Sequence, residues 1–296
     1  MITTRIFGGL GNQMFQYAAG KALALRTGQT LRLDTHWFLH ISKNLTPRDY
    51  ELSIYKNISA PAGNYLNFFQ RNHFDRTHRF ISEHIFDYET KLLNLYHEGN
   101  KNWSDVFLTP ENKNYNLNGY WQSEDYFKDC KDQIKHDFIF PELDDIRDLK
   151  FLQETKTSTV VSLHVRRGDY ISLDGSQTLL GNICTIEYYQ SAIKLIQSKI
   201  DDFRFAVFSD EVNWVKENLS LPDNTLFIDW HTGKNSFRDM QLMSLCDHHI
   251  IANSSFSWWG AWLGQNENKI VIAPNRWLNA EDPLNNTRCP ELWIRI

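Results

Sequence analysis

The second half of the chain begins with Val160-Val161-Ser162-Leu163-His164-Val165, a short apolar run rich in β-branched residues. A run of this length, bounded by polar residues, is typical of a buried strand. After a loop, the helical pattern Ile186 to Ile200 follows. We interpret this part of the chain as the first strand and helix of a parallel α/β sheet.

The same alternation continues almost to the end of the chain. Apolar runs predict further strands at Arg204 to Phe208, Leu226 to Ile228, His249 to Ala252 and Ile270 to Ala273. Segments with helical periodicity lie between them, at Glu211 to Leu219, Phe237 to Cys246 and Ser254 to Leu263. Strands and helices that alternate at these lengths predict a parallel sheet covered by helices on both faces.

The first half of the chain is less regular. Thr3 to Phe7 predicts a strand, and the turn Gly8 to Gly11 follows it. We predict one further helix and strand, Asn12 to Thr27 and Thr30 to Leu33. Residues 40–118 show no clean period and predict loops and short helices.

A polar, charged stretch from Asp148 to Lys156 separates the two halves. A chain of 296 residues is long enough for two domains, each with its own core. We therefore predict a first domain of residues 1–152 and a second domain of residues 153–296, with a C-terminal tail able to pack back on the first. The fold class is α/β.

Composition limits the partners and the compartment. The formal net charge is -5, which argues against nucleic-acid binding because phosphate neutralisation needs clustered Lys and Arg. The four cysteines are far apart in the sequence, which indicates free thiols in a reducing compartment. We find no signal peptide and no window of 18 apolar residues, so we expect a cytoplasmic protein with at most peripheral membrane contact.

Polar residues follow the predicted strands of the second half at the ends where α/β sheets bind ligands. They are Arg166 and Arg167 after the first strand, Ser209 and Asp210 after the second, Asp229 after the third, and Asn253 to Ser257 after the fourth. Arginine presents a planar fork of donors to phosphate, and the amino end of a helix binds anions. The pattern favours a nucleotide diphosphate site; unrelated polar loops are the alternative.

Several of these residues have a second possible role. Asp210 suits ribose hydroxyls or a base edge, and equally the capping of the next helix. Ser254 and Ser255 suit phosphate binding and an N-cap, which are compatible roles. His164 lies in a strand, where a histidine is more often a satisfied core residue than a catalyst.

The turn Gly8-Gly9-Leu10-Gly11-Asn12-Gln13 stands between a strand and a helix, a context that allows close backbone approach to a ligand. Met14 takes the place of the third glycine of the dinucleotide fingerprint, which argues against a nicotinamide site. A tight turn packed against a neighbour is the alternative. No Asp-x-Asp, His-Glu-x-x-His or Cys/His cluster occurs, so we expect no metal and no cofactor.

The order of these motifs resembles glycosyltransferase family 11, the α-1,2-fucosyltransferases. The matching stretches are Gly8-Gly-Leu-Gly-Asn-Gln-Met-Phe-Gln-Tyr-Ala-Ala19, Gly119-Tyr-Trp-Gln-Ser-Glu-Asp-Tyr-Phe127, His164-Val-Arg-Arg-Gly-Asp-Tyr170, Phe208-Ser-Asp210 and Asn253-Ser-Ser-Phe-Ser-Trp-Trp-Gly-Ala-Trp262. The resemblance covers nearly the whole chain. In lacking a membrane anchor, the sequence resembles the bacterial members of the family, which build surface polysaccharide or lipopolysaccharide at the inner membrane.

The resemblance implies a GT-B fold of two Rossmann-like domains with a cleft between them, in which residues 1–152 form the acceptor-side domain and residues 153–296 the GDP-fucose-binding domain. It implies inverting, metal-independent transfer of L-fucose from GDP-β-L-fucose to the 2-OH of a galactose-containing oligosaccharide or lipid-linked glycan. It places Arg166, then Arg167, on the pyrophosphate. The remaining donor-site positions that it implies are His164, Ser209, Asp210, Asn253, Ser254, Ser255, Phe256 and Ser257 in the second domain, and Gly9, Gly11, Asn12 and Gln13 across the cleft.

Direct displacement needs a base for the acceptor hydroxyl, and Asp169 is the first candidate because it follows the arginines. A carboxylate that orients Arg167 is the alternative role for Asp169.

Two other classes of protein remain as alternatives. The aromatic content, 14% of residues, fits a non-catalytic carbohydrate-binding protein. The glycine turn fits, imperfectly, a nucleotide-sugar oxidoreductase or epimerase.

Overall fold

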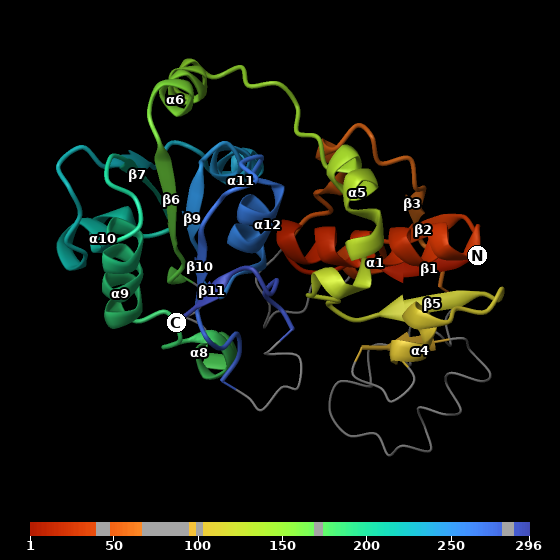
Figure 1. The fold of residues 1–296 in the computed structure, drawn as a ribbon. Coiled ribbons are helices and arrows are strands. Elements are labelled where there is room, and N and C mark those ends of the chain that lie inside the picture. The colour runs from red at the N-terminus through yellow and green to blue at the C-terminus, as the bar shows by residue number, and fades with distance from the viewer. Residues whose placement is uncertain (40–47, 67–94, 99–102, 169–173, 280–286) are drawn as a thin grey trace. The chain divides into compact units, whose positions relative to one another are not determined.

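The computed structural model describes residues 1–39, 48–66, 95–98, 103–168, 174–279 and 287–296 (Figure 1). The chain forms two compact units, Met1–Pro141 and Glu142–Ile296. The division therefore falls before the stretch Asp148 to Lys156, which is not a linker but part of helix α6. The buried side chain of Phe151 on α6 packs into the core of the second unit.

Unit 1 contains a five-stranded sheet in the order β3-β2-β1-β5-β4, in which every described pairing is parallel. Its strands are β1 Ile2–Arg5, β2 Leu31–Asp34, β3 Ala62–Gly63, β4 Leu95–His97 and β5 Tyr115–Asn118. Its helices are α1 Leu10–Thr27, η1 His36–Leu39, η2 Leu52–Ile54, α4 Trp103–Leu108, η3 Glu124–Tyr126, η4 Lys128–Cys130 and α5 Lys131–Asp137.

Helix α1 packs closely against the first strand of unit 1. A Cβ atom on Gly20 would collide with the Thr4 hydroxyl oxygen, so only glycine fits at that contact. The small residues Ala18, Ala19 and Ala22 of the same helix are also buried. The helix begins at Leu10 rather than at the predicted Asn12.

Unit 2 contains a six-stranded sheet in the order β11-β10-β9-β6-β7-β8, again with parallel pairings. Its strands are β6 Val160–Val165, β7 Arg204–Ser209, β8 Leu226–Ile228, β9 His248–Ile250, β10 Val271–Ala273 and β11 Ile294–Arg295. Its helices are α6 Ile146–Thr157, α8 Asp174–Leu180, α9 Ile186–Gln197, α10 Val212–Asn218, η5 Gly233–Asn235, α11 Phe237–Ser244 and α12 Ser255–Leu263.

Strand β6 lies at the centre of this sheet, and all six of its residues are buried. One face of the sheet packs against α9 and α10, through Tyr189 and Val215, and the other against α6 and α11, through Phe151 and Leu242 (Figure 1). Helices on both faces explain why the strands read as continuous apolar runs.

The tryptophans of α12 are core residues, as expected for at least two of them. Trp258, Trp259 and Trp262 are all buried and pack against one another, with ring centroids 5.0 to 6.0 Å apart. The Trp258 indole N–H donates to the Arg288 carbonyl over 2.8 Å, which satisfies the polar atom of a buried ring. All four cysteines are unpaired, as predicted.

Candidate functional site

The carboxyl ends of β6 and β7 lie next to each other, because Val165 pairs with Ser209 at the last position of the register. Arg166 follows β6, and its Nη1 lies 3.0 Å from Oδ2 of Asp210, which follows β7. Oδ1 of Asp210 accepts the backbone N–H of Arg167 over 3.1 Å. The Asp210 carboxylate therefore holds both the side chain of Arg166 and the backbone of the residue after it.

Asp210 does not cap helix α10. The N-cap position belongs to Glu211, which makes no capping contact with its side chain. The Ser209 hydroxyl oxygen accepts the backbone N–H of Glu211 over 3.0 Å, so Ser209 shapes the turn between β7 and α10. Of the two roles left open for Asp210, capping is therefore wrong, and contact with ribose hydroxyls or a base edge stays a prediction. The contacts of Asp210 with the arginine segment were not predicted.

Arg167 contacts a second carboxylate and an aromatic ring. Its Nε lies 3.0 Å from Oε2 of Glu211, and its Cζ lies 3.7 Å from the centroid of the Trp214 ring on α10. A guanidinium stacked on a ring keeps the N–H groups at its edge available for other partners. The sequence indicated neither contact, because Trp214 reads as a core residue and Glu211 as an ordinary first-turn acid.

The two arginines line one cavity of about 320 Å³ at this edge of the sheet. Its other walls come from the end of α8 and the segment after it, the first turn of α9, α10 and the segment after β9. The residues that line it are Arg166, Arg167, Leu180, Gly181, Asn182, Cys184, Thr185, Ile186, Glu187, Trp214 and Asn253. We call it the diarginine cavity. Successive residues of a strand would face opposite ways, but β6 ends at Val165, so both arginines reach the same space.

Asn253 holds the walls of the diarginine cavity in place. Its Nδ2 donates to the Leu180 carbonyl over 3.0 Å and to the Trp277 carbonyl over 3.2 Å. Its Oδ1 accepts from the Cys184 thiol over 3.4 Å, and burial raises the pKa of that thiol to about 12. Cys184 is therefore a neutral structural donor and not a nucleophile.

The segment after Asn253 forms the start of α12, as predicted. Ser254 is the N-cap residue, and its hydroxyl oxygen accepts the backbone N–H of Phe256 over 3.3 Å. Ser255 is the first helical residue and is partly exposed. Ser257 is buried and donates back to the Ser254 carbonyl over 3.3 Å. The capping role of Ser254 is confirmed, and phosphate binding by Ser254 and Ser255 stays a prediction.

His164 is a buried residue of β6, with 6% of its surface exposed, beside the ring of Phe256 at a centroid distance of 5.9 Å. Its Nδ1 has no hydrogen-bond partner among the described residues. Burial, and secondarily the charge of Arg166, lower the pKa of His164 to about 3. The imidazole is therefore neutral at physiological pH. The expectation that this core histidine has its hydrogen bonds satisfied is wrong for Nδ1.

Acidification is expected to destabilise unit 2. Buried His249 also has a pKa lowered to about 3, first by burial and then by Lys269 and His248. The unfolded chain takes up these protons below about pH 6.5, whereas the folded chain does so only near pH 3. The free energy of unfolding should therefore fall by about 1–2 kcal/mol per histidine between about pH 7 and pH 5.

Urea titrations of the wild type and of His249→Gln at both pH values test this expectation. The variant should lose less stability on acidification than the wild type; equal losses would contradict it. His231 acts in the opposite direction. Burial lowers its pKa, but Asp239 at 2.6 Å and Asp148 at 3.0 Å together outweigh this effect and raise it. Its contribution is complete below about pH 6.5 and is lost as the pH rises through its raised pKa.

In unit 1 the glycine turn has the predicted place between β1 and α1. Gly8 adopts a left-handed φ of 75°, and Gly9 is the N-cap of α1. Gly11 is buried within the helix. Asn12 Oδ1 accepts from Gln122 Nε2 over 2.7 Å. Gly8, Gly9 and Asn12 are partly exposed at the start of α1, a position of the kind that binds anions.

Gln13 uses both ends of its amide on nearby backbone. Its Nε2 donates to the Gly8 and Asp49 carbonyls over 2.9 and 2.8 Å, and its Oε1 accepts the Glu51 N–H over 2.9 Å. Gln13 is fully buried, so it supports the turn. The predicted approach of Gly9, Gly11, Asn12 and Gln13 to a donor stays a prediction.

Asp169 lies outside the described residues, directly after Gly168, and its proposed role stays a prediction. Gly168 itself is required by its neighbour: a Cβ atom there would lie 2.6 Å from Oδ2 of Asp210. Among the described residues, no group of three or more His, Cys, Asp or Glu side chains is arranged to hold a metal ion. Within the same ranges, no helix is both long and apolar enough to cross a bilayer.

The fold of the chain is similar to that of solved glycosyltransferases. Fucosyltransferase NodZ from Bradyrhizobium superposes with a TM-score of 0.51 at 15% sequence identity, over 88% of this chain and 91% of that one. The likeness, together with the two parallel-sheet α/β units, confirms the predicted GT-B type fold. The predicted cleft between the units stays a prediction.

The sequence identifies the family. The family model described as Glycosyl transferase family 11 matches residues 1–295. The chain therefore belongs to glycosyl transferase family 11 and is a glycosyltransferase.

Full-length relatives agree with this assignment. An α-1,2-colitosyltransferase of Escherichia coli is 34% identical over 100% of this chain and 99% of that protein. The O-antigen biosynthesis glycosyltransferase WbnK of Escherichia coli is 30% identical over 98% of both chains. Human galactoside α-(1,2)-fucosyltransferase 1 is 28% identical over 50% of this chain and 42% of that protein.

Proposed function

We propose that this glycosyltransferase transfers L-fucose from GDP-β-L-fucose to the 2-OH of a galactose-containing acceptor, with inversion and without a metal ion, in the synthesis of a bacterial surface polysaccharide. The observation that carries the proposal is the pair Arg166 and Arg167 in one cavity, each positioned by a carboxylate from the next strand end. Two fixed guanidinium groups suit a diphosphate leaving group.

The names of the relatives support the proposed linkage and donor class. The names of two relatives specify α-1,2 linkages, and one relative acts in O-antigen biosynthesis. The structurally similar NodZ has been soaked with GDP-fucose. Arg166 and Arg167 would bind the pyrophosphate, and the start of α12 would add backbone N–H donors. An acceptor-side base, Asp169 in our proposal, would take the hydroxyl proton as the new bond forms.

Colitose is a second candidate for the transferred sugar, because a colitosyltransferase shares 34% identity over the full chain. Colitose is L-fucose without its 3-hydroxyl. A site that hydrogen-bonds this hydroxyl rejects the deoxy sugar by a factor of about 10⁴ or more, whereas an apolar site discriminates weakly. The ratio of kcat/KM for the two donors therefore distinguishes the two functions.

The test is to incubate the chain with GDP-fucose or GDP-colitose and a panel of galactosides, and to follow GDP release and the products by mass spectrometry. We expect a fucosylated galactoside and faster turnover with GDP-fucose. Turnover restricted to GDP-colitose would replace fucose by colitose in the proposal, and sugar transfer to no acceptor would contradict it. GDP-induced thermal stabilisation separates a transferase from a lectin, which would ignore GDP.

Metal independence is expected because two arginines, rather than paired carboxylates with a divalent ion, would balance the charge of the departing GDP. Sugar transfer should continue unchanged in excess EDTA. Activity that disappears on chelation and returns with manganese or magnesium would show that the arginines do not stabilise the leaving group alone.

Replacing Gly168 by alanine should weaken GDP binding about tenfold or more, because the new Cβ would displace the Asp210 carboxylate from Arg166. Calorimetric titration with GDP measures the effect. Gly233→Ala is the matched control: its φ of 56° strains alanine, but no other atom lies within 4 Å of the new Cβ. The control should lose stability but keep its GDP affinity. Equal GDP affinity in both variants would contradict the role of Asp210.

A further inference from the structure

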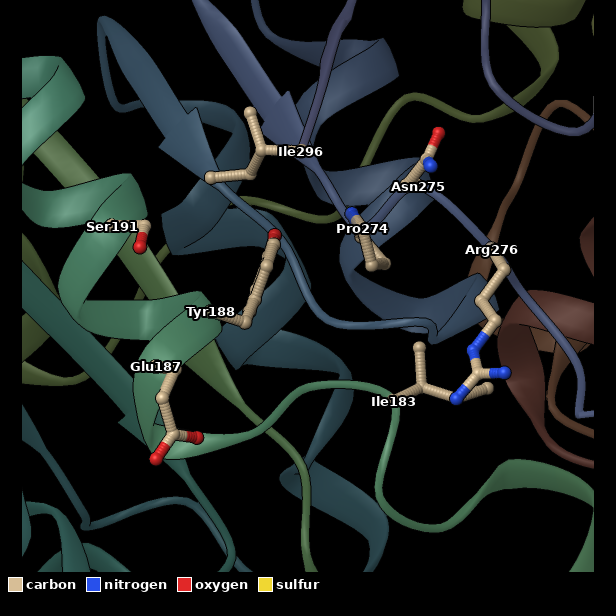
Figure 2. A pocket seen from close by; sticks show the side chains of 8 residues that line it. All are labelled: Ile183, Glu187, Tyr188, Ser191, Pro274, Asn275, Arg276 and Ile296. Carbon is tan, nitrogen blue, oxygen red and sulfur yellow. The ribbon is translucent and has the colours of Figure 1, made fainter.

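A second cavity, of about 380 Å³, lies at the same edge of the unit 2 sheet (Figure 2). It is formed by the first turns of α9, the segment that follows β10 and the end of β11. Its volume falls in the range of about 300–1,000 Å³ that is usual for ligand sites. We call it the Arg276 cavity.

The segment that carries Arg276 is fixed at several points. On one side the Asn275 N–H donates to the Ile296 carbonyl over 2.7 Å. On the other side the Trp277 carbonyl accepts from Asn253, and the side chain of Asn279 donates to the Gly181 carbonyl over 2.8 Å. A ligand would therefore meet a wall that is already ordered, which lowers the entropic cost of binding.

Polar groups of opposite charge stand at the two ends of the cavity. Figure 2 shows the Arg276 guanidinium at one end and the Glu187 carboxylate at the other, with Tyr188 and Pro274 between them. Among the residues that the structure describes, Arg276 has no ion-pair or hydrogen-bond partner. Glu187 bonds to the N-cap residue Thr185, which lowers the pKa of Glu187 and keeps it ionised. The exposed hydroxyl of Ser191 adds a donor and acceptor on the same helix face.

The wall between these ends is apolar. Ile183, Tyr188 and Pro274 are buried residues that line it, and Ile296 completes it. The Tyr188 hydroxyl donates to the Ile251 carbonyl over 2.6 Å, so the orientation of its ring is fixed. This wall can cover the C–H face of a flat ring but offers it no hydrogen bond.

We propose that the Arg276 cavity binds a neutral glycan, as a subsite in unit 2 for the acceptor of the proposed transfer reaction, on which this inference rests. It would add contacts from the donor-binding unit to those of the acceptor-side domain expected for residues 1–152. Pairs of neighbouring sugar hydroxyls match both the donor fork of Arg276 and the two acceptor oxygens of Glu187. The apolar face of the ring packs on the wall between them. An anionic ligand gains from Arg276 but is repelled by Glu187, so a neutral ligand fits both ends.

The position of the cavity supports an acceptor role. Glu187 lines both the Arg276 cavity and the diarginine cavity, and the segment Ile183 to Ile186 runs between them. A saccharide bound at Arg276 would therefore lie beside the place proposed for the donor diphosphate. Its part nearest the arginines could then present a hydroxyl for transfer.

The experiment is a titration of the full chain with lactose, followed through the isoleucine methyl signals by NMR with excess GDP present. Lactose is the probe because it is a neutral galactoside. We expect saturable shifts of the Ile183 and Ile296 methyl signals, whereas the buried Ile134 of unit 1 serves as an internal reference. Arg276→Ala removes the donor fork and Ser191→Trp fills the cavity, so both variants should lose the response to lactose.

Lys194→Ala is the matched control, because it removes one positive charge from the exposed face of α9 without lining the cavity. This variant should respond as the wild type does. The inference is overturned if lactose leaves the Ile183 and Ile296 signals unmoved in the wild type, or moves them equally in Arg276→Ala. It is also overturned if inorganic pyrophosphate shifts these signals and lactose does not.

Fucose transfer to the same lactose separates this inference from the proposed function. Transfer by the wild type without any methyl response would overturn the Arg276 subsite and leave the proposed function intact. A methyl response that depends on Arg276, without transfer from GDP-fucose or GDP-colitose to any galactoside, would overturn the proposed function and leave glycan binding intact.

Discussion

Replacing Arg166 by alanine is expected to lower kcat/KM for sugar transfer about 100-fold or more. Negative charge grows on the departing GDP in the transition state, and a fixed donor aimed at that charge contributes about 10²–10³ in rate. Lysine at the same position keeps the charge but loses the planar fork, so Arg166→Lys should still cost about tenfold or more. Steady-state kinetics with varied donor concentration measure both effects.

Arg204→Lys is a matched control for Arg166. Arg204 stands at the opposite edge of the same sheet, at the start of β7, and pairs with Glu154 over 3.0 Å. Its side chain is 28% exposed, against 27% for Arg166. The control should retain wild-type kinetics. A variant of Arg166 that transfers sugar at the wild-type rate would show that the diarginine cavity does not hold the leaving group.

Replacing Asp169 by asparagine is expected to reduce kcat about 100-fold or more, with GDP affinity nearly unchanged. This follows if Asp169 removes the proton of the acceptor hydroxyl, because general base catalysis contributes about 10²–10⁴ in rate and does not act on the nucleotide. The pH dependence of kcat should lose its acidic limb in the variant. Calorimetric titration with GDP supplies the second measurement.

Asp210→Asn is the informative comparison for Asp169. Asp210 holds Arg166 and the Arg167 backbone, so its loss should weaken GDP binding and turnover together. If Asp169→Asn behaves in that way, Asp169 is an orienting residue and the base must be sought elsewhere. The Arg167 guanidinium already has Glu211 as a described partner, which favours the base role for Asp169. Asp202→Asn, on an exposed loop, should change neither quantity.

The second half of the fold follows closely from its sequence. The strand Val160–Val165 was predicted with the bounds that the structure shows, and Leu226–Ile228 likewise. Strand β6 is buried between helices on both faces, so nearly every residue in it must be apolar. Strand β8 is a partly exposed edge strand, but it is still a short apolar run. Helix ends were less accurate: α9 ends at Gln197, three residues before the predicted end.

The first half was harder to predict because its elements are short and their sequences are mixed. Strand β5 lies beside β1, yet Tyr115–Asn118 is only four residues long, with two asparagines, and was predicted to be irregular. Strand β3 has only two residues, and its place in the sheet depends on pairing with β2. Backbone pairing with a distant strand leaves no periodic signal in so short a segment.

Part of the candidate site could be predicted because parallel strands bring their carboxyl ends to one edge. This rule placed Arg166, Arg167 and Asn253 at the same edge, and all three line the diarginine cavity. The partners Glu211 and Trp214 could not be predicted, because their roles depend on how α10 packs beside Arg167. Asn253 was predicted as a ligand residue, whereas its side chain ties Leu180 to Trp277.

The linkage of the reaction product tests the central proposal most directly. The chain should be incubated with GDP-β-L-fucose and a β-galactoside in the presence of EDTA, and the isolated product analysed by NMR. We predict one product, in which an α-configured fucose is attached to the 2-oxygen of galactose. A β-fucoside, a linkage to another oxygen, or fucose released only to water would contradict the proposed function.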